Sequence, residues 1–295
     1  MLRRRSLAPL AFLLPALAVY ALFVLFPIAQ AAWYSLWEWR YVATERHFVG
    51  LGNYVFLLHD PVFWLALRNN VLLVALSLLI QLPIALGLAV LLSYVKRGRG
   101  LLRTVYFAPM VLPTVAVGLI WMFLYEPDRG LVARFLSLFV ENARCGWLGD
   151  TGAALLAVTA AICWRFIGFH MVLFIAGVES ISEELYEAGR MDGASEWQLL
   201  RHVTLPALWP VIQISAVLSM VGSLKYFDLI YIMTKGGPPE HATELMTTYM
   251  YKVGINEYTG GYGSALAVAG FLVSGIIVAC VMALRARRAA GEATP

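Results

Sequence analysis

The chain has 295 residues, of which 61% are hydrophobic and only 14% are charged, and its mean hydropathy is +0.75. Soluble domains carry roughly a quarter charged residues, so this composition excludes an ordinary soluble protein and indicates a polytopic membrane protein. The length suits about six spans with short connections. The net charge of +4 does not indicate nucleic-acid binding, because the basic residues cluster beside apolar segments, where they orient spans in the bilayer.

The first apolar run extends from about Leu7 to Trp37 and follows the basic residues Arg3–Arg5. A secretory signal is the alternative, because Ala29-Gln30-Ala31 matches the small-residue pattern of a cleavage site. The run is longer than a signal core, which reaches ~15 residues. We therefore expect residues 7–37 to form the first transmembrane helix.

Two further spans are predicted at about 70–92 and 101–125. Four basic residues lie between these two spans or at the start of the second one: Lys96, Arg97, Arg99 and Arg103. Short basic connections of this kind mark the cytoplasmic side of a membrane. Pro109 and Pro113 fall inside the third span, and such prolines are tolerated where neighbouring helices or a cavity satisfy the carbonyls that they free.

The fourth, fifth and sixth spans are predicted at about 153–178, 208–230 and 262–284. Three basic residues follow the last span: Arg285, Arg287 and Arg288. Six spans place both termini in the cytoplasm, which agrees with the basic residues at the two ends and in the 96–103 connection. We therefore predict an all-α fold with a single transmembrane domain over residues 1–295.

The connection between the fourth and fifth spans, residues 179–206, is polar and still carries helix signals. Ser182 can cap a first short helix. Gly193 suits the left-handed residue that ends such a helix. Ser195 and Gln198 have the spacing of a capping box, which predicts a second short helix. The segment is therefore expected to form a compact pair of short cytoplasmic helices.

Glu187-Ala188-Gly189 is followed after three residues by Gly193, and after nine more by Val203-Thr204-Leu205-Pro206. This spacing resembles the cytoplasmic EAA loop of ABC importer permeases, which docks into a groove on the ATPase subunit. Gly189 stands where that family usually has a second alanine, and it loosens the helix by roughly 1 kcal/mol. The residues expected to couple to the ATPase are Glu187, Ala188, Gly189, Asp192, Gly193, Ala194, Trp197, Leu205 and Pro206.

Two predicted outer segments carry the same resemblance. One runs from Phe48 to Tyr54 with Asp60 beyond it, and the other runs from Phe227 to Pro238. Together they are similar to the carbohydrate-uptake group of these importers, of the maltose, glycerol-phosphate and trehalose type. The resemblance implies a multi-pass protein of the inner (plasma) membrane that works by alternating access.

The resemblance also implies the partners of the chain. They are two ATPase subunits, a second and related permease chain, and an extracytoplasmic solute-binding protein. The sequence contains no G-x-x-x-x-G-K-S/T P-loop, so ATP and Mg²⁺ are expected in the ATPase subunits, with no cofactor in this chain. The scattered Cys145, Cys163 and Cys280 are interpreted as packing residues rather than as metal ligands or disulfides.

Arg165 lies near the middle of the fourth span, where a charge is costly and usually faces the bundle interior or water. It is either part of a solute path or a structural arginine bonded to carbonyls freed at a neighbouring proline. His170 has no obvious partner in the sequence. Lys225 and Asp228 can pair, since they are three residues apart. The candidate path residues are Trp164, Arg165, His170, Tyr226, Asp228 and Tyr231.

Two other classes of protein remain as alternatives. An ion-coupled secondary transporter normally shows interrupted helices and midplane carboxylates, and no acidic residue lies at the predicted middle of any span here. A membrane-embedded enzyme needs a catalytic constellation, and the sequence offers none that we recognise, so no enzymatic activity is predicted. The sequence leaves open whether the solute is an oligosaccharide, a polyol or a phosphorylated glycerol.

Overall fold

The structure is a computed structural model that describes residues 8–41, 45–95, 97–138, 146–237 and 240–292. Several residues named above lie outside this part of the chain: Arg3–Arg5, Lys96, Cys145 and Pro238. The chain divides into two compact units, which are described separately. The first holds Met1–Phe63 and Tyr249–Ile276, and the second holds Trp64–Thr248 and Ile277–Pro295.

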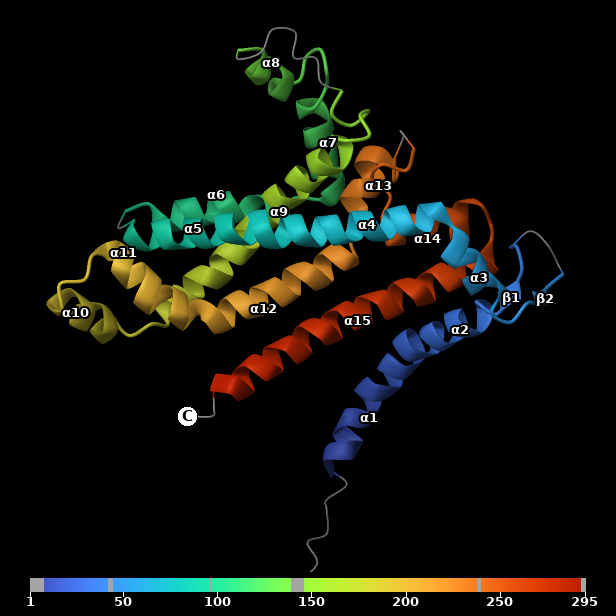
Figure 1. Cartoon of the computed structure of the whole chain (residues 1–295), viewed down its shortest axis with the longest axis horizontal. Coiled ribbons are helices and arrows are strands. Elements are labelled where there is room, and N and C mark those ends of the chain that lie inside the picture. The colour runs from blue at the N-terminus through green and yellow to red at the C-terminus, as the bar shows by residue number, and fades with distance from the viewer. Residues whose placement is uncertain (1–7, 42–44, 96, 139–145, 238–239, 293–295) are drawn as a thin grey trace, which may run out of the picture. The chain divides into compact units, whose positions relative to one another are not determined.

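The first unit combines the start of the chain with a segment near its end (Figure 1). Its elements are α1 (Ala8–Tyr20), α2 (Phe26–Tyr34), β1 (Trp37–Glu38), β2 (His47–Phe48), α3 (Gly52–His59) and most of the apolar part of α15 (Gly260–Glu292). The two short strands form an antiparallel pair, with Trp37 opposite Phe48 and Glu38 opposite His47. A π-helical turn, Lys252–Asn256, leads from α14 (Met246–Tyr251) toward α15.

The second unit is helical throughout its regular structure. Its elements are α4 (Pro61–Leu76), α5 (Leu82–Tyr94), α6 (Arg99–Val111), α7 (Thr114–Leu124), α8 (Leu131–Ser137), α9 (Ala154–Glu179), α10 (Glu183–Met191), α11 (Glu196–Leu199), α12 (Leu205–Leu224) and α13 (Asp228–Thr234). The border between the units falls inside α4 and inside α14, so each of these helices has residues in both units. The central element is α9, which packs against α5, α6 and α12.

Three π-helical turns, each of five residues, end two residues before a proline. They are Ala21–Leu25 with Pro27, Ser77–Gln81 with Pro83, and Leu200–Thr204 with Pro206. Proline lacks an N–H group, and its ring clashes with the carbonyl four residues earlier. The wider π turn changes the local hydrogen-bond register, so the helix continues through the proline. Pro206 thus lies in the first turn of α12 within one unbroken helix, Glu196–Leu224.

Within the described residues, five helices are long and apolar enough to cross a membrane. They are Phe12–Tyr34, Pro61–Tyr94, Ala154–Glu179, Glu196–Leu224 and Gly260–Ala283. A sixth span exists if α6 and α7 are counted together, although they are bent by 98° at Leu112 and Pro113. These helices confirm the prediction of a mostly helical, polytopic membrane protein.

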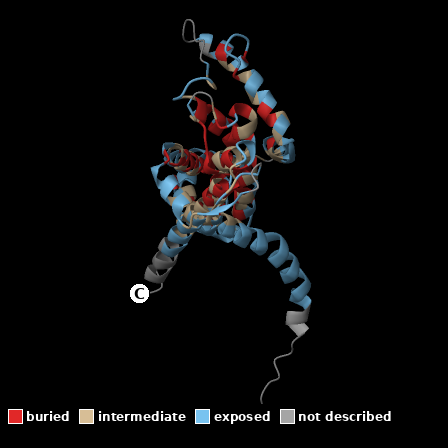
Figure 2. Ribbon diagram, turned by 90° about the vertical axis from the view of Figure 1, so that its right-hand side faces the viewer, coloured by how far each residue is buried: buried red, intermediate tan, exposed pale blue. Residues whose placement is uncertain are grey.

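The candidate spans differ sharply in how much of their surface the chain itself covers. Half of the most apolar window of Ala154–Glu179 is buried inside the structure, whereas none of the corresponding window of Phe12–Tyr34 is buried. Figure 2 shows this contrast as exposed residues along almost the whole of α1 and α2. An apolar helix with no cover from its own chain requires lipid or another protein against its surface.

Two groups of buried apolar side chains pack around α9. One joins the first half of α9 to α4, α7 and α13: Leu73, Val117, Ala157, Val158, Ala161, Ile162, Leu229 and Ile230. The other joins the second half of α9 to α5: Leu82, Ala85, Ala89, Leu92, Met171, Phe174 and Ile175. The middle of α9 separates these two groups and lies close to the π turn Ser77–Gln81.

Gly168 permits α6 to cross the middle of α9 at very short range. A Cβ atom on Gly168 would overlap the backbone carbonyl of Tyr106 in α6. The backbone cannot move aside as a flexible side chain could, so no larger residue fits there without separating the two helices. The glycine therefore fixes where α6 lies on α9, and with it the position of the break that follows α6.

Asp60 is a buried carboxylate that holds together several elements of the first unit. Its Oδ1 accepts a hydrogen bond of 2.8 Å from the backbone N–H of Val62 at the start of α4. Its Oδ2 accepts hydrogen bonds from the hydroxyls of Tyr249 and Tyr262. Burial, and then the bond to Asp60, raise the pKa of the Tyr249 phenol, so the phenol keeps its proton and donates it.

We expect Asp60→Ala to destabilise the protein by about 2 kcal/mol or more, because two phenol donors and one backbone N–H lose their acceptor. The measurement is the thermal unfolding midpoint of the purified protein in detergent. Leu58→Ala, at an exposed position nearby, serves as the control and should leave the midpoint almost unchanged. An Asp60→Ala midpoint equal to that of the control would contradict this account of the first unit.

Candidate functional site

The polar connection between α9 and α12 forms a helical hairpin, which we define as residues 183–199 (α10, the link 192–195 and α11). Ser182 caps α10 through its side chain, which accepts from the N–H of Glu184. The N–H of Ala194 donates to the carbonyl of Gly189 at 2.9 Å, and that of Gly193 donates to Arg190 at 3.1 Å. This is the hydrogen-bond pattern of a Schellman motif.

Glycine is needed at Gly193 because the motif requires a left-handed backbone conformation there, and not because a larger side chain would lack space. Its φ is +78°, in the left-handed region, and a Cβ atom there would meet nothing within 4 Å. The next helix begins with a complete capping box, in which the Ser195 N–H donates to Gln198 Oε1 at 2.7 Å and Ser195 Oγ accepts from the Gln198 N–H. These local bonds therefore help to fix the angle between α10 and α11.

Gly189 brings α10 into close contact with the end of α11. A Cβ atom on Gly189 would lie 2.5 Å from Cδ2 of Leu199, which is almost completely buried. An alanine here would therefore have to displace the tip of the Leu199 side chain. This contact gives a packing reason for glycine at a position where the EAA-loop resemblance leads us to expect alanine.

Glu196 links α11 to α10 and to the end of α5. Its Oε1 pairs with Arg190 at 3.4 Å, and its Oε2 accepts from the Tyr94 hydroxyl at 3.2 Å. The hydroxyls of Tyr186 and Thr204 are hydrogen-bonded at 3.0 Å. These groups surround a small polar cavity of about 220 Å³ beneath the hairpin.

Glu179, at the end of α9, binds the basic segment at the start of α6. It forms an ion pair of 3.1 Å with Arg99 and accepts a hydrogen bond from Arg103. The basic connection that the sequence predicts to be cytoplasmic therefore lies at the same end of the bundle as the helical hairpin. The two segments are consequently on one side of any membrane that the bundle crosses.

The hairpin carries apolar side chains that its own chain leaves uncovered. Met191 is 88% exposed, Trp197 is 67% exposed and Leu185 is 53% exposed. Glu187 and Ala188 are exposed beside them. Large apolar side chains grouped on a polar, projecting element are typical of a protein-binding surface.

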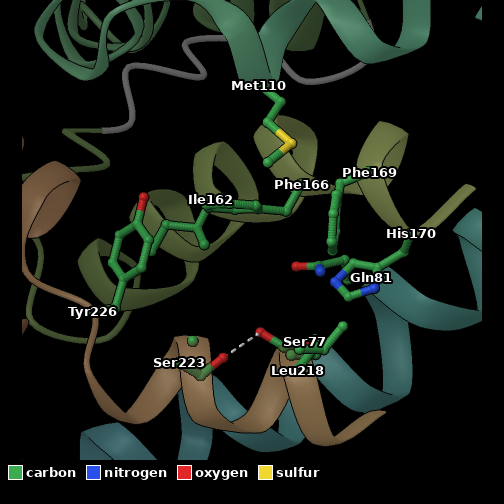
Figure 3. Close-up of a pocket in the computed structure, with 12 residues that line it drawn as sticks. Ser77, Gln81, Met110, Ile162, Phe166, Phe169, His170, Leu218, Ser223 and Tyr226 are labelled. Carbon is green, nitrogen blue, oxygen red and sulfur yellow. Dashed lines mark hydrogen bonds between the residues drawn. The ribbon is translucent and has the colours of Figure 1, made fainter. Parts of the chain in front are cut away.

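A second candidate site is a cavity of about 240 Å³ beside the middle of α9, which we call the α9 cavity. It lies between the two buried apolar groups described above. Its lining residues come from the π turn Ser77–Gln81, α6, α9, α12 and the residues just after α12: Ser77, Gln81, Met110, Ile162, Phe166, Phe169, His170, Leu218, Ser219, Gly222, Ser223 and Tyr226. Figure 3 shows Tyr226 at one side and His170 with Gln81 at the other.

Polar groups of the α9 cavity are only partly paired. Ser223 donates to Ser77 at 3.1 Å, and His170 Nδ1 lies 2.6 Å from Ser215 Oγ. Ser219 Oγ is buried and has no hydrogen-bond partner among the described residues, whereas the Tyr226 hydroxyl interacts with the Arg165 side chain. Buried polar atoms are nearly always paired, so Ser219 Oγ is suited to bind a ligand or water in the cavity.

Arg165 does not line the α9 cavity but binds the break between α6 and α7. Its Nη1 donates to Thr114 Oγ1 at 2.7 Å, and its Nη2 lies 3.5 Å from the carbonyl oxygen of Leu112. These residues flank Pro113, so the contacts are those expected of an arginine that satisfies groups freed at a proline. Arg165 also lies close enough to Tyr226 to interact with it electrostatically.

The structure brings only some of the predicted path residues together. His170 and Tyr226 both line the α9 cavity, whereas Trp164 packs edge-on against Trp121 at 5.7 Å. Tyr231 stacks on the ring of Phe227 at 5.0 Å. The i, i+3 helical spacing expected for Lys225 and Asp228 does not apply, because α12 ends at Leu224 and α13 begins at Asp228.

Several polar residues of the α9 cavity were missed by sequence reasoning. Ser215, Ser219 and Ser223 repeat every four residues along α12, which places them on one helix face. This stripe of hydroxyls in an apolar span was a readable signal, and it contains the partner of His170. Gln81 was a second signal, since a buried amide within a span requires polar surroundings. Within the described residues, His, Cys, Asp and Glu form no group of three that could hold a metal ion.

Comparison with known proteins gives a consistent result. A family model described as the binding-protein-dependent transport system inner membrane component matches residues 81–290. A probable ABC transporter permease of Pyrococcus horikoshii is 37% identical over 90% of this chain and 91% of its own length. The diacetylchitobiose uptake permease of Streptomyces coelicolor is 33% identical over 96% and 83%, and the trehalose/maltose transport permease of Thermococcus litoralis is 31% identical over 88% of each chain.

A solved structure shares the fold. A chain of a bacterial ABC transporter that imports the acidic polysaccharide alginate superposes with a TM-score of 0.83, with 24% identity over 96% of both chains. A chain of a methionine ABC transporter superposes less closely, with a TM-score of 0.51 and 18% identity over 78% of this chain and 98% of that one.

We expect Gly193→Val to open the hairpin, because a β-branched residue in the left-handed region costs about 1–2 kcal/mol, or about a tenfold change in the intact population. The measurement is the rate of tryptic cleavage after Arg190, which should rise about tenfold. Gly193→Asn is the matched variant and should change the rate much less, since asparagine tolerates this conformation. Cleavage after Arg97 provides the internal control, and equal rates for both variants would contradict the assignment.

We expect Arg165→Lys to lower the maximal rate of solute uptake by roughly fivefold, the effect of one lost hydrogen bond, because an ammonium cannot replace the planar guanidinium at the α6–α7 break. The half-saturating solute concentration should stay unchanged, since Arg165 binds the break and not the α9 cavity. A raised half-saturating concentration with an intact maximal rate would instead place Arg165 in contact with the solute.

Proposed function

We propose that this chain, which belongs to the family of binding-protein-dependent transport system inner membrane components, is a pore-forming subunit of an ATP-driven importer of a sugar or sugar-like solute. The observation that carries the proposal is the helical hairpin at residues 183–199, which presents exposed apolar side chains from an otherwise membrane-embedded chain. A permease that has no nucleotide-binding motif of its own requires a surface to which its ATPase subunit can bind.

In this proposal the hairpin docks into a groove on the ATPase subunit. The residues that would make or shape the contact are Glu187, Ala188, Gly189, Asp192, Gly193, Ala194, Trp197, Leu205 and Pro206. ATP and Mg²⁺ would bind, and ATP would be hydrolysed, in the ATPase subunits. The capped and glycine-closed hairpin supports this role, because an element that transmits motion must keep its own shape while it moves.

The proposed topology has six spans, with α6 and α7 counted as one, and both termini in the cytoplasm of the inner membrane. It is supported by the basic residues Arg99 and Arg103, whose ion pairs with Glu179 place them beside the hairpin. Positive residues in short connections face the cytoplasm. The whole chain, residues 1–295, would then act as one transmembrane domain with the 38–60 segment on the outer side.

The complete importer would contain two ATPase subunits, a second and related permease chain, and an extracytoplasmic solute-binding protein. The helix Phe12–Tyr34 supports a further subunit in the membrane, since none of its most apolar window is buried within this chain. Closure of the ATPase dimer around ATP would move the hairpins and open the pore outward to receive solute. Release of the nucleotide would return it inward, which is alternating access.

The hairpin and the α9 cavity are joined by one continuous helix. Glu196–Leu224 starts in the hairpin and carries Ser219, Gly222 and Ser223 at the cavity wall. Along an α-helix, the 23 residues from Glu196 to Ser219 cover about 35 Å. A shift of the hairpin would therefore reach the cavity through a single helix, without an intervening loop.

The α9 cavity is the proposed solute site within the membrane. Aromatic rings from Phe166, Phe169 and Tyr226 offer faces for the C–H groups of a sugar, and the Ser219 hydroxyl, which is unpaired among the described residues, offers a hydrogen bond. The relatives named for diacetylchitobiose and for trehalose or maltose support a saccharide as the solute. The wider path would include Trp164, Arg165, His170, Tyr226, Asp228 and Tyr231.

The alternatives are not favoured. An ion-coupled secondary transporter would need carboxylates within its spans. The carboxylates nearest the α9 cavity in sequence are Glu179, at the end of α9, and Asp228, after the end of α12. A membrane-embedded enzyme of the serine type would need a carboxylate that orients the base, and among the described residues no hydrogen bond or ion pair joins the His170–Ser215 pair to a carboxylate. The chain also belongs to a family of transport components.

We expect Trp197→Glu to abolish co-purification of the ATPase and ATP-dependent uptake together, because it places a charge at the centre of the proposed apolar contact. Trp197→Phe keeps an aromatic side chain and should retain most of both activities. The measurements are recovery of the ATPase with the tagged permease and uptake of radiolabelled sugar into proteoliposomes. Full ATPase recovery by the Trp197→Glu variant would overturn the docking assignment.

A further inference from the structure

The first unit contains a large cavity that shares no residue with the α9 cavity. Its volume is about 610 Å³, within the range of small-molecule sites. We call it the α3 cavity, because α3 forms one wall. The lining residues come from β1 and the segment after it, the link between β2 and α3, α3, and the chain from α14 into α15: Glu38, Trp39, Arg40, Val49, Gly52, Asn53, Phe56, Tyr249, Val253, Glu257, Thr259 and Tyr262.

The α3 cavity combines aromatic rings with hydrogen-bonding groups. Phe56 and Tyr262 both line it and form an edge-to-face pair with ring centroids 4.9 Å apart. Asn53 donates through Nδ2 to the carbonyls of Ser35 and Trp37, which fixes the direction of its amide. Aromatic rings beside carboxylates and an oriented amide match the alternating C–H and hydroxyl surface of a sugar ring.

The walls of the α3 cavity are rigid. The buried Asp60 carboxylate holds the hydroxyls of Tyr249 and Tyr262 in place. The indole of Trp39 packs so closely on Gly260 that a Cβ atom there would overlap the ring. A preformed site of this kind binds a ligand without the loss of side-chain freedom that weakens flexible sites.

One polar atom at the α3 cavity is left without a bond. The Trp39 Nε1 atom is buried and lacks a hydrogen-bond partner among the described residues. Because Trp39 lines the cavity and buried donors are nearly always paired, this donor is suited to bind a hydroxyl group of a ligand.

The charges around the α3 cavity restrict the kind of ligand. Glu38 and Glu257 are exposed at its edge and contribute two negative charges, while Arg40 contributes one positive charge. Beside the lining, the buried carboxylate of Asp60 adds one negative charge, and the Arg46 guanidinium, whose Cζ lies 4.9 Å from the centroid of the Trp39 ring, adds one positive charge. The balance of these groups is one net negative charge. Excess negative charge repels a carboxylated sugar and attracts an ammonium group. The cavity is thus suited to neutral or amino sugars and unsuited to uronic acids.

We propose that the α3 cavity is a second saccharide site, specific for neutral or amino-sugar units, on the extracytoplasmic side of the permease. It rests on the proposed import of sugars, and it adds a site that this chain itself offers outside the membrane-embedded path. Solute leaving the binding protein would be held there by Phe56, Tyr262 and the two edge carboxylates before it enters the pore.

The test uses the complete importer in nanodiscs without its solute-binding protein. Saturation-transfer NMR measures binding of three probes: a glucose trisaccharide, a glucosamine trisaccharide and a uronic-acid trisaccharide. The first two should bind and the third should not. Phe56→Ala should weaken the binding of both of these probes by about fivefold, which is the effect expected when one aromatic contact with the sugar is lost. Glu257→Gln should weaken the glucosamine probe more than the glucose probe.

Glu126→Gln is the matched control, because Glu126 is an exposed carboxylate in the second unit and does not line the α3 cavity. Binding of the uronic-acid probe as strongly as the others, or saccharide binding that Phe56→Ala and Glu257→Gln leave unchanged, would overturn the inference. So would an absence of saccharide binding until the solute-binding protein is added, which would make the cavity a docking surface for that protein.

Uptake into proteoliposomes with the solute-binding protein present, measured beside probe binding in nanodiscs, separates this inference from the proposed function. Ser219→Trp fills the α9 cavity and should abolish uptake while leaving probe binding at the α3 cavity intact. Intact uptake in Ser219→Trp would count against the proposed solute path alone. Intact uptake with no probe binding in the unmodified importer would count against the α3 site alone.

Discussion

The structure depends on one constraint: backbone N–H and C=O groups within an apolar environment must find partners inside the protein. The spans meet it even where their helices are interrupted. Asn70 donates to the carbonyls of Ser223 and Leu224 at the end of α12, and Asn69 donates to those of Ala242 and Glu244. Arg165 does the same at the α6–α7 break. Polar side chains within the spans therefore first serve helix ends, and only those left over are free to face a solute.

The same constraint explains why the π turns matter for function. Ser77–Gln81 lies before Pro83, and its widened turn brings both Ser77 and Gln81 to the α9 cavity. Leu200–Thr204 lies before Pro206 and allows the hairpin to continue directly into α12. Proline thus interrupts the regular hydrogen bonding without ending the helix. The chain gains a cavity wall at one turn and an unbroken connection to the hairpin at the other.

Sequence reasoning succeeded where structure is local and failed where it depends on distant partners. The hairpin was predictable because Ser182, Gly193, Ser195 and Gln198 act on neighbours within a few residues. The α9 cavity was not, because His170 meets Ser215 and Ser77 meets Ser223 across 45 and 146 positions of sequence. Proline positions predicted disturbances of the helices, but the sequence could not tell a break at Pro113 from the continuous helices at Pro83 and Pro206.

The contacts of the hairpin differ in strength in a way that suits a moving part. Its internal bonds, the Schellman motif and the capping box, are short and local, and they fix its shape. Its tie to α5 is an exposed hydrogen bond between Tyr94 and Glu196, and hydrogen bonds contribute about 1 kcal/mol each. Its connection to α12 is covalent and helical. A hairpin that is stiff within itself, weakly held at α5 and fused to the helix at the cavity wall transfers displacement preferentially along that helix.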